Sequence, residues 1–409
     1  MISLATYLFR NARVLEPSRD DLFEADVLVR DERIAAVGAD ARQNADDLRV
    51  LDVRGMTLMP GLIDCHVHVT AVAADLSAMA EWSPFYVAAR TAEVLKGMLD
   101  RGFTTVRDAA GADWGIAQAI DEGFLIGPRV LFGGNALSQS GGHGDVRSRG
   151  RMSVPESASN MSSVCDGVDE VRRAVRHELR RGAHHIKLML SGGVASPTDR
   201  VDSTQFSLDE IRAAVEEATA ANRYVLGHAY TSRAIDRGLE CGVRSIEHGN
   251  LMQDSSIGLF LKHHAFYVPT LVTYWALAEH GKAAGLPQAS FEKVFDVLDA
   301  GRGALERAYR GGVPIAFGTD LLGAMHQYQS REFRIRSEVM PPIEVIRSAT
   351  SVAARLVCME GQIGTLSPGA YADLLVVDGN PLSDIGVLAE PESHLKLVMK
   401  AGQVCRECV

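Results

Sequence analysis

The 409-residue sequence lacks several features that mark whole classes of protein. Its six cysteines show no paired spacing of the kind that builds a disulfide framework. No apolar run reaches the roughly 18 residues that a membrane-spanning helix needs. The first residues also lack the basic start and apolar core of a secretory leader. We therefore expect a protein of the reducing cytoplasm, without a membrane partner.

An excess of positive charge is missing as well, since the formal net charge is -10. Nucleic-acid partners require clustered Lys and Arg, so this balance argues against them. The Arg-rich stretch at residues 169–182, "DEVRRAVRHELRRG", alternates with apolar residues at helical spacing, and we interpret it as a solvated helix face. Cys405 and Cys408 resemble half of a zinc site, but no second pair completes it.

What the sequence does contain is an ordinary globular composition, with 46% hydrophobic residues, arranged in two styles. Residues 1–58 and 358–409 show short alternating runs broken by Asp, Asn, Gly and Pro, which predict small strands and turns. Two β-rich ends around a different middle predict one small β-sandwich built from both termini. Residues 59–357 form the second predicted domain.

The middle region alternates short β-branched runs with longer stretches of helical period, which is typical of βαβ units and a parallel sheet. Eight parallel strands that close on themselves make a (β/α)8 TIM barrel, an α/β fold whose chemistry lies at the C-terminal strand ends. Eight such runs occur: "LMPGLIDCHVH", "FTTVRDA", "RVLFGG", "HHIKLML", "RYVLGHA", "VRSIEHG", "AFYVPTLV" and "VPIAFGTD".

One long interruption follows the third run, at about residues 137–168, and it is rich in Gly, Ser, Arg and Asn. A loop of this length inside a compact domain is usually a functional lid or a disordered insert. We favour the lid.

The first run ends in "DCHVHV", which places His66 and His68 two residues apart. Side chains alternate along a strand, so both histidines point to the same side and can share a metal ion. Two hydrogen-bonded core histidines would give the same short pattern. The other strand ends must decide between these interpretations.

Four further polar residues lie at the ends of apolar runs. Lys187 follows "HHI" in the fourth run, and a lone buried lysine is costly unless its amine reaches solvent. Asp320 follows "PIAFGT", where it also fits as a helix N-cap. The fifth and sixth runs end near His228 and His248, and each alone is as well explained by a hydrogen bond. Together, these imidazoles, carboxylate and lysine supply a ligand set that suits zinc or a similar divalent ion.

These residues, in this order, resemble the amidohydrolase superfamily, whose binuclear members carry H-x-H on strand 1, a carboxylated lysine on strand 4, histidines on strands 5 and 6 and an aspartate on strand 8. The resemblance implies two divalent metal ions, with zinc expected. One ion would be held by His66, His68 and Asp320. The other would be held by His228 and His248, with an N-carboxylated Lys187 and a hydroxide bridging the two ions.

A narrower resemblance rests on "SQSGGHGD", "IKLMLSGGVASPTD", "GHAYT", "IEHGNL" and "FGTDLLG". These segments are similar to metal-dependent dipeptidases and carboxypeptidases resembling Xaa-Pro dipeptidases, a branch that includes enzymes cleaving the amide of ochratoxin A. The likeness implies an enzyme that cleaves an amide to release a C-terminal amino acid from an Xaa-Pro dipeptide or an N-acyl amino acid. Aryl amides, carbamates and an ochratoxin-like N-acyl-phenylalanine are the alternative substrates, and a non-catalytic barrel scaffold is the remote alternative. We also expect a homo-oligomer.

The expected roles follow from this chemistry. Asp320 would take a proton from the attacking water and pass it to the leaving amine. His143, unless it is merely an exposed loop histidine, and Tyr230 would stabilise the oxyanion. The product carboxylate needs donors, for which there are two candidate groups. They are the backbone after Lys187, at Gly193, Val194 and Ala195, and the side chains of Arg147 and Arg149.

Overall fold

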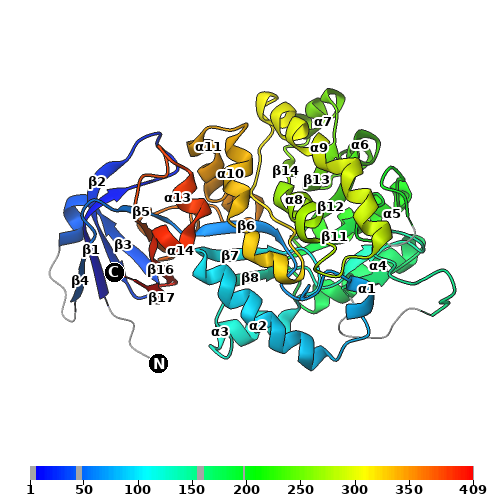
Figure 1. The fold of residues 1–409 in the computed structure, drawn as a ribbon, viewed down its shortest axis with the longest axis horizontal. Helices are drawn as coiled ribbons and strands as arrows, with labels where there is room; N and C mark the ends of the chain where they lie inside the picture. The colour runs from blue at the N-terminus through cyan, green and yellow to red at the C-terminus, as the bar shows by residue number, and fades with distance from the viewer. Residues whose placement is uncertain (1–5, 43–47, 154–160, 197–198, 409) are drawn as a thin grey trace. The chain divides into compact units, whose positions relative to one another are not determined.

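The computed structural model describes residues 6–42, 48–153, 161–196 and 199–408 (Figure 1). The chain divides into two compact units. The terminal unit comprises Met1–Asp64, Lys96–Val106 and Ser330–Val409, and the central unit comprises Cys65–Leu95 and Arg107–Gln329. Within the described ranges, no helix is both long and apolar enough to cross a membrane. All six cysteines are free thiols.

Strands from both ends of the sequence form one eight-stranded sheet in the terminal unit, drawn in blue and red in Figure 1. Its order is β17-β16-β15-β5-β1-β2-β3, and β4 also pairs with β1. The strands are β1 (Thr6–Val14), β2 (Phe23–Arg30), β3 (Arg33–Val37), β4 (Leu48–Asp52), β5 (Thr57–Pro60), β15 (Leu374–Val377), β16 (Leu395–Lys400) and β17 (Gln403–Glu407). Because they belong to a single sheet, the two-sheet sandwich stays a prediction.

A bulge in β1 keeps the apolar side chains on the core face. Tyr7 and Phe9 point into the terminal unit's core, and the pairing with β2 shifts after Phe9. Asn11 then adopts a φ of 59°, a left-handed conformation that Asn tolerates. The extra residue returns Ala12 and Val14 to the same core, although their numbers are even. The alternation read from the sequence therefore changes phase inside this strand.

The strands β6 to β14 make two further sheets. One is parallel and six-stranded, in the order β10-β9-β11-β12-β13-β14, and the other has the order β6-β7-β8. The strands are β6 (Leu62–Val67), β7 (Phe103–Asp108), β8 (Arg129–Phe132), β9 (Ala136–Ser138), β10 (Ser162–Val164), β11 (His185–Met189), β12 (Tyr224–Thr231), β13 (Ser245–Leu251) and β14 (Phe266–Val268).

Seven of the eight predicted runs contain strands, but the last run, residues 313–320, does not form one. Only Ile315 makes a bridge there, to Tyr267. Pro314 has no N–H to donate, which limits a regular ladder. The mixed α/β fold with parallel sheet segments is confirmed, whereas closure into a barrel stays a prediction.

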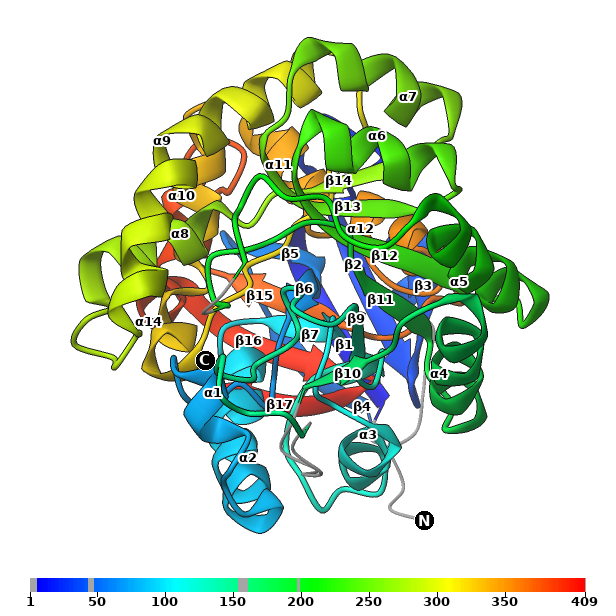
Figure 2. The same ribbon diagram turned by 90° about the vertical axis from the view of Figure 1, so that its right-hand side faces the viewer.

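Helices follow most of the parallel strands. Figure 2 shows α4, α5 and α6 on the outer side of the strands against which they pack. The helices are α1 (Leu76–Met79), α2 (Pro84–Asp100), α3 (Trp114–Asp121), α4 (Val168–Arg180), α5 (Leu208–Ala220), α6 (Ser232–Glu240), α7 (Ile257–Lys262), α8 (Leu271–His280), α9 (Gln288–Arg310), α10 (Arg331–Ser337), α11 (Pro342–Ser348), α12 (Ser351–Leu356), α13 (Gly386–Ala389) and α14 (Pro391–His394). Three short 3-10 helices are η1 (Gly38–Arg42), η2 (Asp254–Ser256) and η3 (Gly323–Tyr328).

The Arg-rich stretch forms α4, and its arginines pair with acids of α5. Arg172 Nη1 lies 2.7 Å from Glu217 Oε1, and Arg176 Nη2 lies 2.6 Å from the same oxygen. Helix α5 begins at a capping box, in which Ser207 Oγ accepts from the Glu210 N–H and the Glu210 carboxylate accepts from the Ser207 N–H. These arginines form ion pairs between α4 and α5, and Arg176 keeps 66% of its side chain exposed, as expected for a solvated helix face.

The predicted lid, residues 137–168, contains two short strands in the described part. β9 and β10 pair in parallel, so the two ends of the segment meet at the edge of the six-stranded sheet. Residues 154–160 of this segment lie outside the described ranges. Its role as a lid stays a prediction.

Candidate metal centre and its pocket

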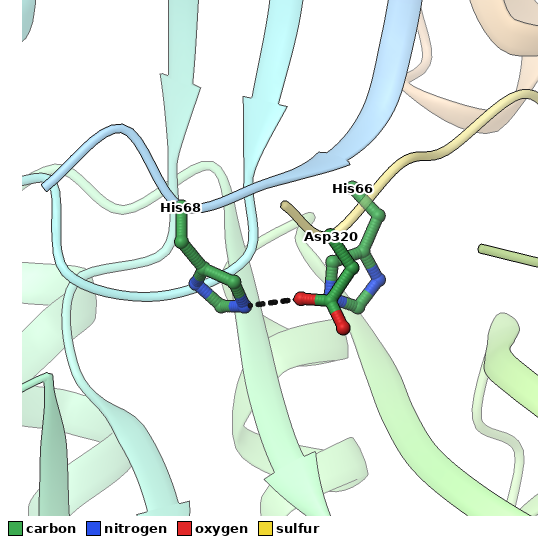
Figure 3. A group of neighbouring side chains, drawn as sticks. All are labelled: His66, His68 and Asp320. Carbon is green, nitrogen blue, oxygen red and sulfur yellow. Dashed lines mark ion pairs between the residues drawn. The ribbon is translucent and has the colours of Figure 1, made fainter. Parts of the chain in front are cut away.

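His66, His68 and Asp320 form a compact group that could hold a metal ion, as Figure 3 shows. One ligand atom from each residue lies within 4.8 Å of the others. Nε2 of His68 is 3.1 Å from Asp320 Oδ1, and Nε2 of His66 is 3.5 Å from the same oxygen. The Asp320 N–H also donates to the His66 carbonyl at 2.8 Å. The aspartate is thereby attached to β6, which carries His66 and ends one residue before His68.

Hydrogen bonds fix which ring nitrogen each histidine presents to Asp320. Nδ1 of His66 lies 2.6 Å from Glu247 Oε2, and Nδ1 of His68 lies 2.8 Å from the Ala110 carbonyl oxygen. Both acceptors favour a proton on Nδ1, which leaves Nε2 as the lone-pair donor. The two rings therefore offer ligand nitrogens on the side where the carboxylate lies.

The second predicted ligand set lies beside the first. Ring centroids of His228 and His248 are 4.6 Å apart, and those of His248 and His66 are 4.9 Å apart. Nδ1 of His248 contacts Thr270 Oγ1 at 2.8 Å, and Nε2 of His228 contacts the Gly192 carbonyl oxygen at 3.1 Å. Lys187, on β11, lines the same pocket as these rings. The structure thus brings all six predicted metal ligands to one place.

His248 adopts a φ of 72°, in the left-handed region that non-glycine residues rarely occupy. The pairing of β12 with β13 is irregular at this point. Consecutive residues in a regular strand face opposite ways, but this distortion lets both Glu247 and His248 reach the interior.

The protonation states of these groups suit a cation. Burial lowers the pKa of His66, His228 and His248 well below the usual histidine value, so the rings are neutral. Burial also lowers the pKa of Lys187 to about 8. For Asp320, burial acts to raise the pKa, but the rings of His66 and His68 outweigh it and the pKa falls. For His68, burial acts to lower the pKa, but the Asp320 carboxylate outweighs it and the pKa rises. Neutral imidazoles and an ionised carboxylate are the forms that bind metal, so His66, His228, His248 and Asp320 are in forms that fit a divalent ion.

His143 forms one wall of the pocket, where it stacks on His228 with ring centroids 4.2 Å apart. Its Nδ1 lies 2.8 Å from Ser196 Oγ, and the Ser196 hydroxyl donates to Asp199 Oδ1. A Cβ atom at Gly193 would lie 2.1 Å from His143 Cε1, so this position requires glycine. The histidine is therefore a pocket residue and not an exposed loop residue.

Lys293, on α9, holds the loop that carries Ser196. Its ammonium donates to three backbone carbonyl oxygens, those of Gly193 at 3.0 Å, Ser196 at 2.9 Å and Asp199 at 2.6 Å. One side chain thus fixes the backbone of the segment opposite His143.

Tyr230 lines the pocket and receives a hydrogen bond from a second tyrosine, since Tyr274 Oη donates to Tyr230 Oη at 2.9 Å. Burial raises the pKa of Tyr230, so its hydroxyl stays protonated at neutral pH. A protonated phenol can donate to an oxyanion, which is the role predicted for Tyr230.

The candidate carboxylate-binding residues occupy different environments. Val194 and Ala195 line the pocket, whereas the Gly193 N–H donates to Asp199 Oδ2 at 3.2 Å. Arg147 is engaged by Asp145, with Nε 2.7 Å from Oδ1, and Arg149 is exposed and outside the pocket lining. The structure therefore brings Val194 and Ala195 to the candidate centre and leaves Arg149 away from it.

The remaining lining of the pocket is mostly apolar. It includes Leu76, Ala110, Ala136, Val146, Met161, Met189, Leu277 and Leu322, with Thr273 and Ser162 as neutral polar neighbours. A substrate that fills this space would contact hydrocarbon around a polar centre.

Several residues at the site were missed in the sequence. Glu247 and Arg107 both interrupt apolar runs, as Lys187 does, so a cost-of-burial argument would have identified them. Ser196, Asp199 and Lys293 carry no such signal, because they lie in a loop and on a helix and meet His143 only through the fold.

A sequence profile of the amidohydrolase family matches residues 57–405. The chain belongs to this family. Members of the family usually bind a metal ion, which agrees with the group of His66, His68 and Asp320 in this amidohydrolase.

Known relatives narrow the comparison. The chain is 34% identical to ochratoxinase of Aspergillus niger over 403 residues, which cover 94% of this chain and 83% of that one. The crystal structure of a prolidase complexed with N-methylphosphonate-L-proline has 49% identity and a TM-score of 0.96, with coverage of 98% and 100% of the two chains. A Xaa-Pro dipeptidase with bound methionine in its active site has 28% identity and a TM-score of 0.87, with coverage of 98% and 99%.

These similarities confirm the predicted likeness to Xaa-Pro dipeptidases and ochratoxin-cleaving enzymes. They also establish the class of reaction. This amidohydrolase is a hydrolase that acts on carbon–nitrogen bonds.

Proposed function

We propose that the chain is a binuclear metal-dependent hydrolase that cleaves an amide to release a C-terminal amino acid, from Xaa-Pro dipeptides or N-acyl amino acids. The observation that carries this proposal is the convergence of four histidines, Lys187 and Asp320 in one pocket. The 49% identity to a prolidase that binds a proline analogue supports this choice of leaving group.

We further propose that two divalent ions, expected to be zinc, are held as the family resemblance implies. His66, His68 and Asp320 would hold one ion, His228 and His248 the other, and Lys187 would bridge them. When bound, such ions lower the pKa of a coordinated water and polarise the amide carbonyl.

N-carboxylation of Lys187 supports the bridging role chemically. The neutral amine attacks carbon dioxide, a C–N bond forms, and one proton is released. A pKa of about 8 gives the Lys187 amine a larger neutral fraction near neutral pH than an ordinary lysine has. The resulting carbamate replaces a cation beside two dications with an anion.

Asp320 is the proposed proton carrier. Its carboxylate would accept a proton from the attacking water and deliver that proton to the leaving nitrogen. The hydroxyl of Tyr230 would donate to the carbonyl oxygen as negative charge develops there. His143 would share this role with its proton on Nε2, the tautomer in which the Ser196 hydroxyl donates to Nδ1 and not to Asp199. Backbone groups at Val194 and Ala195 are the proposed donors to the product carboxylate. Of the other predicted donors, the Gly193 N–H and Arg147 already bind Asp199 and Asp145, and Arg149 lies outside the pocket lining.

A comparison of substrates tests the proposal. We expect the zinc-loaded protein to hydrolyse apolar Xaa-Pro or N-acyl-Pro substrates with a higher kcat/KM than Xaa-Arg or N-acyl-Phe substrates. No hydrolysis of any of these amides would refute the function.

The 34% identity to ochratoxinase favours a second candidate substrate, an N-acyl-phenylalanine of the ochratoxin type. The apolar lining of the pocket is compatible with an aromatic group. A preference for N-acyl-Phe over every proline substrate would support this alternative.

We also propose that the central strands close into a (β/α)8 barrel. Backbone hydrogen bonds support closure at the two places where the central sheets do not pair as regular strands. His184 N donates to Phe132 O at 2.9 Å, which joins the start of β11 to β8. Cys65 N donates to Phe317 O at 2.7 Å, which joins β6 to the last predicted run. Slow amide exchange at Cys65 and His184 would be the expected result. The predicted domain limits, the terminal β-sandwich, the lid, the homo-oligomer and the cytoplasmic location stay predictions.

A further inference from the structure

A fully buried polar cluster lies beside the candidate metal centre. It consists of Arg107 on β7, Ser245 and Glu247 on β13, and the ring of His66, and each of these residues has 0% exposure. Two charged side chains without solvent are costly unless their hydrogen bonds are satisfied. The cluster therefore needs a structural or functional reason.

Arg107 holds the Glu247 carboxylate with several hydrogen bonds. Nη2 donates to both carboxylate oxygens, at 2.9 Å to Oε1 and 2.8 Å to Oε2. Ser245 Oγ accepts from Arg107 Nη1 at 3.0 Å and donates to Glu247 Oε1 at 2.6 Å. A carboxylate that receives these three hydrogen bonds acts as an acceptor at both oxygens and cannot rotate freely.

The remaining contact of this carboxylate points to His66. Glu247 Oε2 lies 2.6 Å from His66 Nδ1 and already accepts from Arg107, so it accepts a hydrogen bond from a proton that resides on Nδ1. With Nδ1 protonated, Nε2 carries the lone pair, and Nε2 is the nitrogen 3.5 Å from Asp320 Oδ1. The cluster thus selects one tautomer and one ring orientation.

We propose that Glu247 is a positioning residue, anchored by Arg107, that fixes His66 in the tautomer whose Nε2 binds metal. This inference rests on the proposed metal-dependent function. Glu247 would raise metal affinity without touching the ion or the substrate, because a carboxylate behind a ligating imidazole increases its basicity and orients it.

The test measures the affinity of the metal-stripped full-length protein for Zn(II), by competition with a chelator. We expect Glu247→Gln to weaken Zn(II) binding about 10- to 100-fold, the usual effect of removing such a partner. An affinity within about twofold of wild type, in a folded variant, would overturn the proposal.

The chain offers a matched control in α10. Glu332 and Arg336 form another buried pair with 0% side-chain exposure and 2.7 Å between Nε and Oε1. Both Glu332→Gln and Glu247→Gln leave a buried arginine beside a neutral amide, so both should lower the thermal midpoint. Only Glu247→Gln should weaken Zn(II) binding. Equal weakening in both variants would show a general effect of instability and overturn the proposal.

Two further measurements apply if Glu247→Gln does not fold. The double variant Arg107→Met, Glu247→Gln removes both charges, and we expect the same loss of Zn(II) affinity. Nitrogen NMR of metal-free wild-type protein with labelled histidine, assigned with His66→Asn, reports the tautomer directly. We expect a protonated Nδ1, and a protonated Nε2 on His66 would overturn the proposal. Failure of wild type to bind Zn(II) would instead refute the proposed function, and the tautomer would still decide the inference.

Discussion

The two ligand sets of the candidate metal centre lie side by side but differ in charge. His66 and His68 have a carboxylate of their own, since Asp320 Oδ1 lies 3.1 Å from His68. His228 and His248 have Lys187 as their predicted partner, and Asp320 reaches this set only at 3.8 Å from His248 Nδ1. The first set can bind a cation with the chain as it is translated. In the proposed centre, the second set would gain an anionic ligand from N-carboxylated Lys187.

The two sets also differ in what surrounds them. Nδ1 of His66 is hydrogen-bonded to the buried Glu247, whereas the rings of His228 and His248 stack on His143 and Tyr230. The first ligand set is therefore surrounded by charged groups, whereas the second lies next to the groups that we expect to contact the substrate. Four variants test this division.

Replacement of Asp320 should have the largest effect on turnover. In Asp320→Asn the proposed proton carrier is lost, so kcat should fall about 10²- to 10⁴-fold. Metal content, measured by mass spectrometry of the purified protein, should stay close to wild type, because His66 and His68 remain. Asp254→Asn changes an exposed acid and serves as the control. Turnover near the wild-type level in Asp320→Asn would remove Asp320 as the base.

Replacement of Lys187 should selectively remove the metal ion that we expect at His228 and His248. We expect Lys187→Ala, prepared with bicarbonate and zinc, to bind about one metal equivalent where wild type binds about two, because the bridging anion is absent. Short carboxylates such as acetate should restore part of the activity. The exposed Lys262→Ala is the control. Wild-type metal content in Lys187→Ala would contradict a bridging role.

Removal of the Ser196 hydroxyl tests whether this residue positions His143, which stacks on His228 of the second ligand set. Ser196→Ala deletes the partner of His143 Nδ1, and one such hydrogen bond corresponds to about a five- to tenfold loss of kcat. KM and metal content should change little. Ser203→Ala, which removes an exposed hydroxyl from the same loop, is the matched control. Equal kinetics in both variants would show that Ser196 does not position His143.

The smallest effect is expected for Tyr274→Phe. This change removes one neutral hydrogen bond to Tyr230 and leaves the aromatic packing in place, so kcat/KM should fall about threefold. Steady-state kinetics with an N-acyl amino acid would measure it. Loss of metal in this variant would mean that the tyrosine pair supports the ligands and not the substrate.

Functional residues at strand ends were easier to predict from the sequence than the buried residues that contact them. His66, His68 and Asp320 could be found because polar residues end apolar runs, and the structure brings them within 4.8 Å. Glu247 could not be placed, because regular alternation puts it opposite His248 and the φ of 72° that reverses this is set by the surrounding fold.

Two other features depended on tertiary context. Residues 313–320 have the sequence pattern of a strand, but they contain Pro314 and form a single isolated β-bridge, at Ile315. His143 gave no periodic signal, because its position is set by contacts with Ser196 and His228 from other parts of the chain. The local sequence pattern therefore identified the secondary-structure elements. Loop contacts and backbone distortions depend on tertiary contacts, so only the structure revealed them.

Lys293 has a consequence for attempts to change substrate range. Val194 and Ala195 are natural targets for mutagenesis because they line the pocket. Their backbone, however, runs between carbonyl groups that share one ammonium donor. A library that keeps Lys293 and Gly193 fixed should yield altered specificity in stable proteins, whereas one that varies them should be enriched in folded but inactive clones.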